Sequence, residues 1–167
     1  LNSGVHQISI LTQFNSVSLH RHIARTYHFD SFHPGWVQVL AAEQTFSSDD
    51  WYQGTADAVR KQLHEIKVTA SRDILVLAGD HLYRMDYGGL LDFHRTEGAD
   101  VTVAVQPVAA AEASRFGILK LGADGRIRSF VEKPQTQTAL QGYISRDDSE
   151  RPYVGSMGIY VFRAEVL

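Results

Sequence analysis

The stretch "DILVLAGDHLYRMDY", residues 73–87, decides the fold class of this sequence. Four apolar residues in a row, Ile74 to Leu77, predict a buried strand over 73–78, and the chain then reaches the carboxylate of Asp80. In an open parallel sheet, ligands bind beyond the carboxyl ends of the strands. Asp80 is therefore a candidate ligand-binding residue, and closure of the strand by a hydrogen bond to the next loop is the equally good alternative.

Strand and helix patterns alternate along the first hundred residues. Strands are expected over residues 7–12, 36–42, 73–78 and 101–108. Helices are expected to begin after Asn15 or Ser16, near Thr55 and near Tyr87, each with apolar residues at helical spacing. This alternation is typical of mostly parallel strands with helices on both faces of the sheet. The sequence therefore predicts an α/β, Rossmann-like fold with a mostly parallel, mixed sheet.

The pattern changes after Pro107. The stretch "FGILKLGADGRIRSFVEKP", residues 116–134, predicts a β-hairpin with Asp124 and Gly125 in its turn. A last strand is expected over "YVGSMGIYVF", residues 153–162, and residues 135–151 are expected to form a flexible loop. A chain of 167 residues is long enough for one domain with a hydrophobic core.

The composition narrows the possible functions. Hydrophobic residues make up 44% and charged residues 21%, which is typical of a folded globular protein. The net charge is −3, and no basic block indicates a nucleic acid or a lipid surface as partner. No apolar run approaches the roughly 20 residues that a membrane helix needs. Because cysteine is absent, disulfides and zinc–thiolate sites are excluded, and a reducing, intracellular setting fits.

Two common kinds of catalytic site find no support in the sequence. His20 and His22 are two residues apart, so they do not share a helix face, and no HExxH motif is present. The sequence also has neither a GxSxG motif nor a cysteine nucleophile. Histidine-based metal sites and hydrolase chemistry are therefore poor hypotheses.

The stretch "WYQGTADAVR", residues 51–60, could hold a ligand at the start of a helix. Gly54 would let the backbone approach a flat ligand, and the helix start would offer N–H groups to an anion. The simpler interpretation is purely structural. Gly54 would then make the turn, Thr55 would be the N-cap, and Asp57 would interact favourably with the helix dipole.

Two later segments also contain candidate binding residues. In "SFVEKP", residues 129–134, Lys133 could meet a phosphate while Glu132 accepts hydrogen bonds from sugar hydroxyls. In "GSMGIYVF", Ser156 lies between two glycines where a backbone could pass close to a sugar. Taken alone, the first segment is more simply an exposed strand end, and the second a bulged strand.

Six segments together resemble one enzyme family. In chain order they are "LTQFNSVSLHRHI", "VLAAEQT", "DWYQGTADAVR", "LAGDHLYRMDY", "FGILKL…GRIRSFVEKP" and "SMGIYVF". They are similar to ADP-glucose pyrophosphorylases (glucose-1-phosphate adenylyltransferases), and the resemblance covers nearly the whole chain. "FVEKP" is shared across sugar nucleotidyltransferases, whereas "WYQGTADAVR" and "LAGDHLYRMDY" point to the ADP-glucose branch.

The resemblance implies a reaction and a sugar-phosphate site. The family transfers the adenylyl group of ATP to glucose 1-phosphate, giving ADP-glucose and pyrophosphate for glycogen or starch synthesis. Asp80 would hold a catalytic Mg²⁺, and Lys133 would bind the phosphate of glucose 1-phosphate. Glu132, Gly117 and Ser156 would contact the sugar.

The resemblance also implies a nucleotide site and its regulation. Gln44, Gly54 and Thr55 would bind the nucleotide. Trp51 and Gln53 would lie on a loop that links an effector site to ATP binding. The implied partners are ATP and glucose 1-phosphate in a homotetramer, without nucleic acid or membrane. The implied location is the bacterial cytoplasm, or the plastid in a plant.

Several features of the family are absent from the sequence. Their absence predicts that residues 1–167 form a single partial catalytic domain. The family begins with a strand and a glycine-rich GGxGTRL-type loop, supplies a second metal-binding aspartate downstream, and ends in a β-helix domain. Nothing here matches these parts, so this piece alone is expected to be inactive. Three alternatives stay open: a sugar nucleotidyltransferase using UTP, GTP or dTTP, a non-catalytic regulatory subunit, and a scaffold associating through sheet edges.

Overall fold

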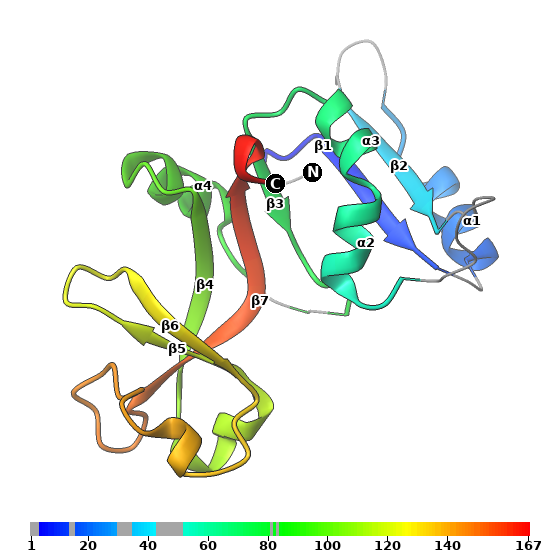
Figure 1. The fold of residues 1–167 in the computed structure, drawn as a ribbon. Helices are drawn as coiled ribbons and strands as arrows, with labels where there is room; N and C mark the ends of the chain where they lie inside the picture. Colours follow the sequence, from blue (N-terminus) through cyan, green and yellow to red (C-terminus); the bar gives the residue numbers. More distant parts are fainter. Residues whose placement is uncertain (1–3, 14–15, 30–34, 43–51, 81, 83) are drawn as a thin grey trace. The chain divides into compact units, whose positions relative to one another are not determined.

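The computed structural model describes residues 4–13, 16–29, 35–42, 52–80, 82 and 84–167. Its helices and mixed sheets confirm the predicted α/β class (Figure 1). The chain forms two compact units, which are described separately. The first unit comprises Leu1–Ile74, Arg84–Asp92 and Arg163–Leu167, and the second comprises Leu75–Tyr83 and Phe93–Phe162.

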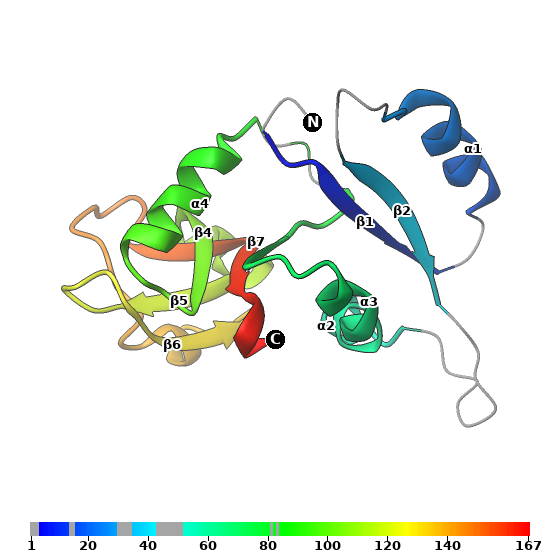
Figure 2. The same ribbon diagram turned by 90° about the horizontal axis from the view of Figure 1, so that it is seen from above.

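The first unit contains a parallel pair of strands. Strand β1 (Gln7–Thr12) pairs with β2 (Trp36–Ala41) in register from end to end, and Figure 2 shows the two side by side. Both strands were predicted, and β2 ends one residue earlier than expected. Helix α1 (Val17–Thr26) follows β1 and buries Ile23. Its N-cap is Ser16, one of the two expected residues, although the Ser16 side chain makes no capping hydrogen bond.

Residues 55–68 form two short helices where one was expected. Helix α2 (Thr55–Lys61) and helix α3 (Leu63–Val68) meet at Gln62, whose φ of −101° and ψ of 10° interrupt the helix. The expected apolar face of Val59, Leu63 and Ile66 is partly covered, with Ile66 buried and the other two half-buried. The prediction of Thr55 as N-cap is wrong, because Gly54 holds that position and Thr55 is the first helical residue.

Most of the second unit is built on a five-stranded sheet. Its strands are β3 (Asp73–Val76), β4 (Val101–Val108), β5 (Gly117–Leu121), β6 (Ile127–Glu132) and β7 (Tyr153–Arg163). Their order is β3-β7-β5-β6, and β4 pairs with β7. The pairings β4–β7, β5–β6 and β5–β7 are antiparallel. Strand β3 is two residues shorter than predicted, and Leu77, the residue after it, is already 44% exposed.

The predicted hairpin turn is confirmed, and a second glycine follows the end of helix α4. The β5–β6 hairpin turns at Asp124 and Gly125, and the positive φ of Gly125, 74°, is the left-handed conformation that glycine adopts readily. Helix α4 (Tyr87–Thr96) ends just before Gly98, whose φ is 58°. A glycine in this conformation is a common helix terminator.

The core of the second unit joins the sheet to two short 3₁₀ helices, η1 (Ala110–Arg115) and η2 (Thr138–Leu140). A third, η3 (Ala164–Val166), follows β7. The buried cluster consists of Val108, Ala113, Ile118 and Leu140. Residues 135–151 were predicted to form a flexible loop, but they contain η2 and anchor Leu140 in this cluster at 8% exposure. Apolar burial therefore ties part of this segment to the sheet.

Candidate active site

Three residues predicted to contact a sugar lie in one row across the sheet of the second unit. Strands β5 and β6 pair Gly117 with Glu132. Strands β5 and β7 pair Ile118 with Gly155, so one step along the antiparallel ladder Gly117 faces Ser156. Residues opposite one another in antiparallel strands point to the same face of the sheet. The strand register thus brings together Ser156, Gly117 and Glu132, which are far apart in sequence.

This row lies on the face of the sheet opposite the core cluster. Ile118 belongs to that cluster, and Val131 packs against it. Side chains alternate between the two faces along a strand, so Gly117 and Glu132 point the other way. The Glu132 side chain is 61% exposed, which leaves its carboxylate available to a ligand.

Gly117 itself is buried beneath two side chains of β6. A Cβ atom at this position would lie 2.6 Å from two ring atoms of Phe130 and 3.0 Å from Oε2 of Glu132. Separations this short are repulsive, so only glycine leaves room for the ring and the carboxylate over this position of β5. The Gly117 backbone is therefore covered rather than open to a ligand on this side.

Lys133 follows the row in an unusual backbone conformation. Its φ is 42°, in the left-handed region that non-glycine residues seldom adopt. The backbone is held by a 3.1 Å hydrogen bond from Lys133 N–H to the carbonyl of Phe116. The Nζ atom lies 3.5 Å from Oε1 of Glu132, and both side chains are more than 60% exposed. Water screens such a pair, so the ammonium group can exchange this carboxylate for a phosphate.

Ser156 lies at a bulge in β7, as the structural interpretation of "GSMGIYVF" predicted. Val103 of β4 pairs with Tyr160 of β7, and Val105 pairs with Ser156. Two residues of β4 therefore correspond to four residues of β7. The Oγ atom of Ser156 accepts a 3.2 Å hydrogen bond from the N–H of Gly158, whose φ is 70°. It also lies 3.2 Å from Oη of Tyr160. The bulge fixes the direction of the serine hydroxyl.

Asp80 lies in an exposed turn, four residues beyond the end of β3, because this strand ends earlier than predicted. Within the described ranges there is no group of three or more His, Cys, Asp or Glu residues that could hold a metal ion. Mg²⁺ commonly takes only one or two protein carboxylates and completes its shell with substrate phosphates and water. A single exposed aspartate is compatible with that mode of binding.

The first unit positions the predicted nucleotide-binding turn. Gly54 has φ 147° and ψ 178°, a conformation that is essentially restricted to glycine. Among the described residues, no atom lies within 4 Å of the point where a Cβ atom would stand. The backbone conformation is therefore what requires glycine here.

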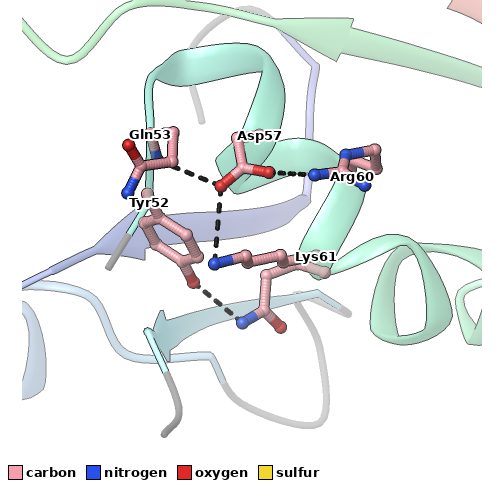
Figure 3. A network of polar contacts seen from close by, with 6 residues as sticks. Tyr52, Gln53, Asp57, Arg60 and Lys61 are labelled. Atoms are coloured by element: carbon pink, nitrogen blue, oxygen red, sulfur yellow. Dashed lines mark hydrogen bonds and ion pairs between the residues drawn. The ribbon is translucent and has the colours of Figure 1, made fainter. Parts of the chain in front are cut away.

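Asp57 holds this turn against the start of α2 (Figure 3). Its Oδ2 atom accepts a 3.0 Å hydrogen bond from the backbone N–H of Gln53 and lies 3.5 Å from Nζ of Lys61. Its Oδ1 atom accepts a hydrogen bond from Arg60. The hydrogen bond from Gln53, and next the one from Arg60, hold the pKa of Asp57 below its ordinary value. An internal carboxylate thus occupies the helix start, which favours the structural interpretation of Asp57.

Gln62 ties the same turn to the parallel strands. Its Nε2 atom donates to the carbonyl of Ala41 at 3.1 Å and to Oη of Tyr52 at 2.8 Å, the second bond being drawn in Figure 3. These two bonds use both amide hydrogens of a side chain that is only 9% exposed. The end of β2 and the residue before Gln53 are thereby connected through one side chain.

Two predicted residues, Gln44 and Trp51, lie outside the described residues. Gln53, predicted for a regulatory loop, is exposed and anchored to Asp57 through its N–H. Thr55, predicted to bind nucleotide, is the exposed first residue of α2. Gly54, Thr55 and Gln53 therefore form one turn in the first unit, while Asp80, Gly117, Glu132, Lys133 and Ser156 belong to the second.

The buried histidine His94 makes a contact inside the second unit. His94 is 2% exposed, and its Nδ1 lies 2.7 Å from Oγ1 of Thr102, linking α4 to β4. No helix in the described part of the chain has the length and apolar character needed to cross a membrane.

Sequence reasoning did not identify Phe130, Tyr160 or Gln62 as contributors to these sites. Phe130 follows the alternation of β6, so its presence on the same face as Glu132 could have been read from the spacing. Tyr160 reaches Ser156 only because a bulge intervenes, and no sequence pattern gives the size of that bulge. Gln62 is a polar residue within an apolar helix pattern, which was a usable signal for a buried hydrogen bond.

The α/β fold with mixed sheets is of the nucleotide-diphospho-sugar transferase type. The family model for nucleotidyl transferases matches residues 1–167. The chain therefore belongs to the nucleotidyl transferase family. This membership supports an enzyme of the general kind to which "FVEKP" pointed.

Proposed function

We propose that the full-length protein transfers the adenylyl group of ATP to glucose 1-phosphate, giving ADP-glucose and pyrophosphate. Membership of the nucleotidyl transferase family supports the reaction type. The segments "WYQGTADAVR" and "LAGDHLYRMDY" support the choice of ATP, through their resemblance to ADP-glucose pyrophosphorylases. Glycogen or starch synthesis is the process that such a product would serve.

The observation that carries the proposal is the convergence of Ser156, Glu132 and Lys133 at one end of the β5–β6 hairpin and the adjoining β7 strand. A hydroxyl and a carboxylate suit the hydroxyls of a sugar, and the ammonium group suits its phosphate. The left-handed conformation of Lys133 adds support, because backbone strain of this kind concentrates at functional sites.

The proposed chemistry is an in-line displacement at phosphorus. A phosphate oxygen of glucose 1-phosphate attacks the α-phosphorus of ATP, the bond to the bridging oxygen breaks, and pyrophosphate leaves with its electron pair. No covalent intermediate with the protein is needed. The two substrates are both anions and repel one another, so the positive charge of Lys133 lowers the electrostatic barrier to bringing them together.

Asp80 is the proposed Mg²⁺ ligand. When bound, Mg²⁺ supplies positive charge to the triphosphate. Gly54 is proposed to lie against the base, because glycine lets a flat ring approach that turn closely.

A substrate panel tests the proposal. The full-length protein is incubated with ATP, UTP, GTP or dTTP and with glucose 1-phosphate, and the release of pyrophosphate is measured. We expect pyrophosphate with ATP and little with the other three nucleotides. Preference for another nucleotide would assign the protein to a different sugar nucleotidyltransferase, and binding of nucleotide without turnover would indicate a regulatory subunit.

A further inference from the structure

The ring of Phe130 forms the surface that Gly117 was expected to provide. Two atoms of this ring occupy the space directly over Gly117, at 2.6 Å from the position of a Cβ atom. The Phe130 side chain is nevertheless 50% exposed, whereas Gly117 is buried. A ligand that approaches this part of the sheet therefore meets the aromatic ring before it meets the glycine backbone.

Three polar residues lie near Phe130 in the strand register. Glu132 lies two residues along the same strand, on the same face, and its Oε2 approaches the same point over Gly117 to 3.0 Å. Ser156 lies across β5 on the next strand, by the register that pairs Ile118 with Gly155. The exposed ammonium group of Lys133 follows Glu132. One half-exposed aromatic ring thus shares this end of the sheet with a carboxylate, a hydroxyl and a cation.

A sugar phosphate has the chemistry that fits this arrangement. A hexose ring carries hydroxyls around its edge and C–H groups on its faces. The face of an aromatic ring bears partial negative charge and attracts C–H groups, which carry partial positive charge. A binding site for such a molecule needs an apolar surface for the face and a few polar groups for the edge, and both are present here.

We propose that Phe130 is a specificity-determining residue on which the ring of the sugar 1-phosphate stacks. This inference rests on the proposed function and adds a residue to the sugar site. Gly117 acts indirectly, by leaving room for the Phe130 ring to lie across β5. A ring that served only to cover the glycine would contribute to stability and not to substrate binding.

The test uses the full-length protein with Phe130→Leu, Phe130→Trp and, as a control, Phe93→Leu, which alters an exposed phenylalanine on α4. Michaelis constants for ATP and glucose 1-phosphate, kcat and Tm are measured for each. We expect Phe130→Leu to raise the KM for glucose 1-phosphate by about three- to tenfold, the range for one aromatic contact. The KM for ATP and kcat should stay within about twofold, because the contact is the same in ground and transition states.

Two further variants separate stacking from a structural role. Phe130→Trp preserves an aromatic face and should keep the KM for glucose 1-phosphate close to that of the wild type. Gly117→Ala should displace the ring and reproduce the rise in KM seen with Phe130→Leu. A lower Tm for Phe130→Leu with an unchanged KM for glucose 1-phosphate would overturn the inference. A wild-type protein that turned over no sugar 1-phosphate at all would overturn the proposed function as well.

Discussion

Gln62 and Tyr52 are joined by a hydrogen bond of 2.8 Å from Nε2 to Oη, and the same Nε2 reaches the carbonyl of Ala41 at 3.1 Å. Gln62 lies at the junction of α2 and α3, so one amide connects this junction, the end of β2 and the turn before Gly54. Because the amide is buried, its hydrogen bonds are expected to contribute measurably to stability.

Replacing Gln62 with methionine keeps the length of the side chain and removes both hydrogen bonds. We expect Gln62→Met to destabilise the protein by about 1–3 kcal/mol, since buried backbone and hydroxyl acceptors lose their donor. Tyr52→Phe should have a smaller effect. Denaturant unfolding of both single variants and the double variant measures the coupling energy. Fully additive effects would mean that the Gln62–Tyr52 bond contributes nothing, and His64→Gln on the exposed part of α3 is the control.

Gly54→Ala should destabilise the protein although no atom of the described residues lies where the new methyl group would stand. The φ of 147° and ψ of 178° are strained for alanine, with an expected penalty of about 1–3 kcal/mol. Gly79→Ala is the matched control, because its site likewise has no described atom within 4 Å and its φ is outside the strained range. Thermal unfolding of the two variants should show a lower Tm for Gly54→Ala alone. Equal Tm values would contradict the assigned backbone conformation.

Stability should decline in acid because three carboxyl groups are stabilised in their charged form. The pKa values of Asp57, Asp124 and Asp148 are lowered, in each case chiefly by a hydrogen bond from a backbone N–H group. Their contribution is complete above the unfolded-state pKa of about 4 and is lost as the pH falls through the lower folded-state values. Tm measured from pH 6 to pH 2.5 should therefore decrease below about pH 4. Asp124→Asn should reduce this decrease in Tm. An unchanged dependence of Tm on pH in this variant would argue against a stabilising role for the Asp124 carboxylate.

Lys133→Ala should weaken the binding of glucose 1-phosphate. The loss of a charge-assisted contact to phosphate predicts a rise in its KM by roughly tenfold or more, with a smaller change in the KM for ATP. Steady-state kinetics of pyrophosphate release by the full-length protein measures both constants. Lys67→Ala, which removes an exposed lysine of α3, should behave like the wild type. Normal kinetics in Lys133→Ala would show that the phosphate site lies elsewhere.

Asp80→Asn should reduce turnover while leaving the fold intact. The substitution keeps the shape of the side chain and removes the charge proposed to hold Mg²⁺, so kcat should fall by roughly a hundredfold or more. Because Asp80 is exposed, Tm should change little. The concentration of Mg²⁺ needed for half-maximal rate is the second measurement, and it should rise. Normal turnover and an unchanged Mg²⁺ requirement in this variant would show that Asp80 is not a Mg²⁺ ligand.

Local pattern predicted most of the secondary structure. Residues 7–12, which include Ile8, Ile10 and Leu11, form β1, and the Asp124–Gly125 pair turns the β5–β6 hairpin as its residue types predict. The candidate residues Asp80, Glu132, Lys133 and Ser156 were also found from sequence, because each belongs to a short motif. These properties depend on neighbours within a few residues, which a sequence displays directly.

Other features were decided by contacts between distant residues. Gln62 interrupts the expected helix and donates a hydrogen bond to the carbonyl of Ala41. Leu140, in a segment expected to be a loop, is buried in the core cluster. The row of Ser156, Gly117 and Glu132 exists because two strand pairings have particular registers, and a shift of one residue would turn a strand's side chains to the other face. The sequence by itself determined the strand and helix pattern and the candidate residues for the proposed chemistry. Only the tertiary structure decided that the Phe130 ring covers Gly117, because that contact depends on packing between strands.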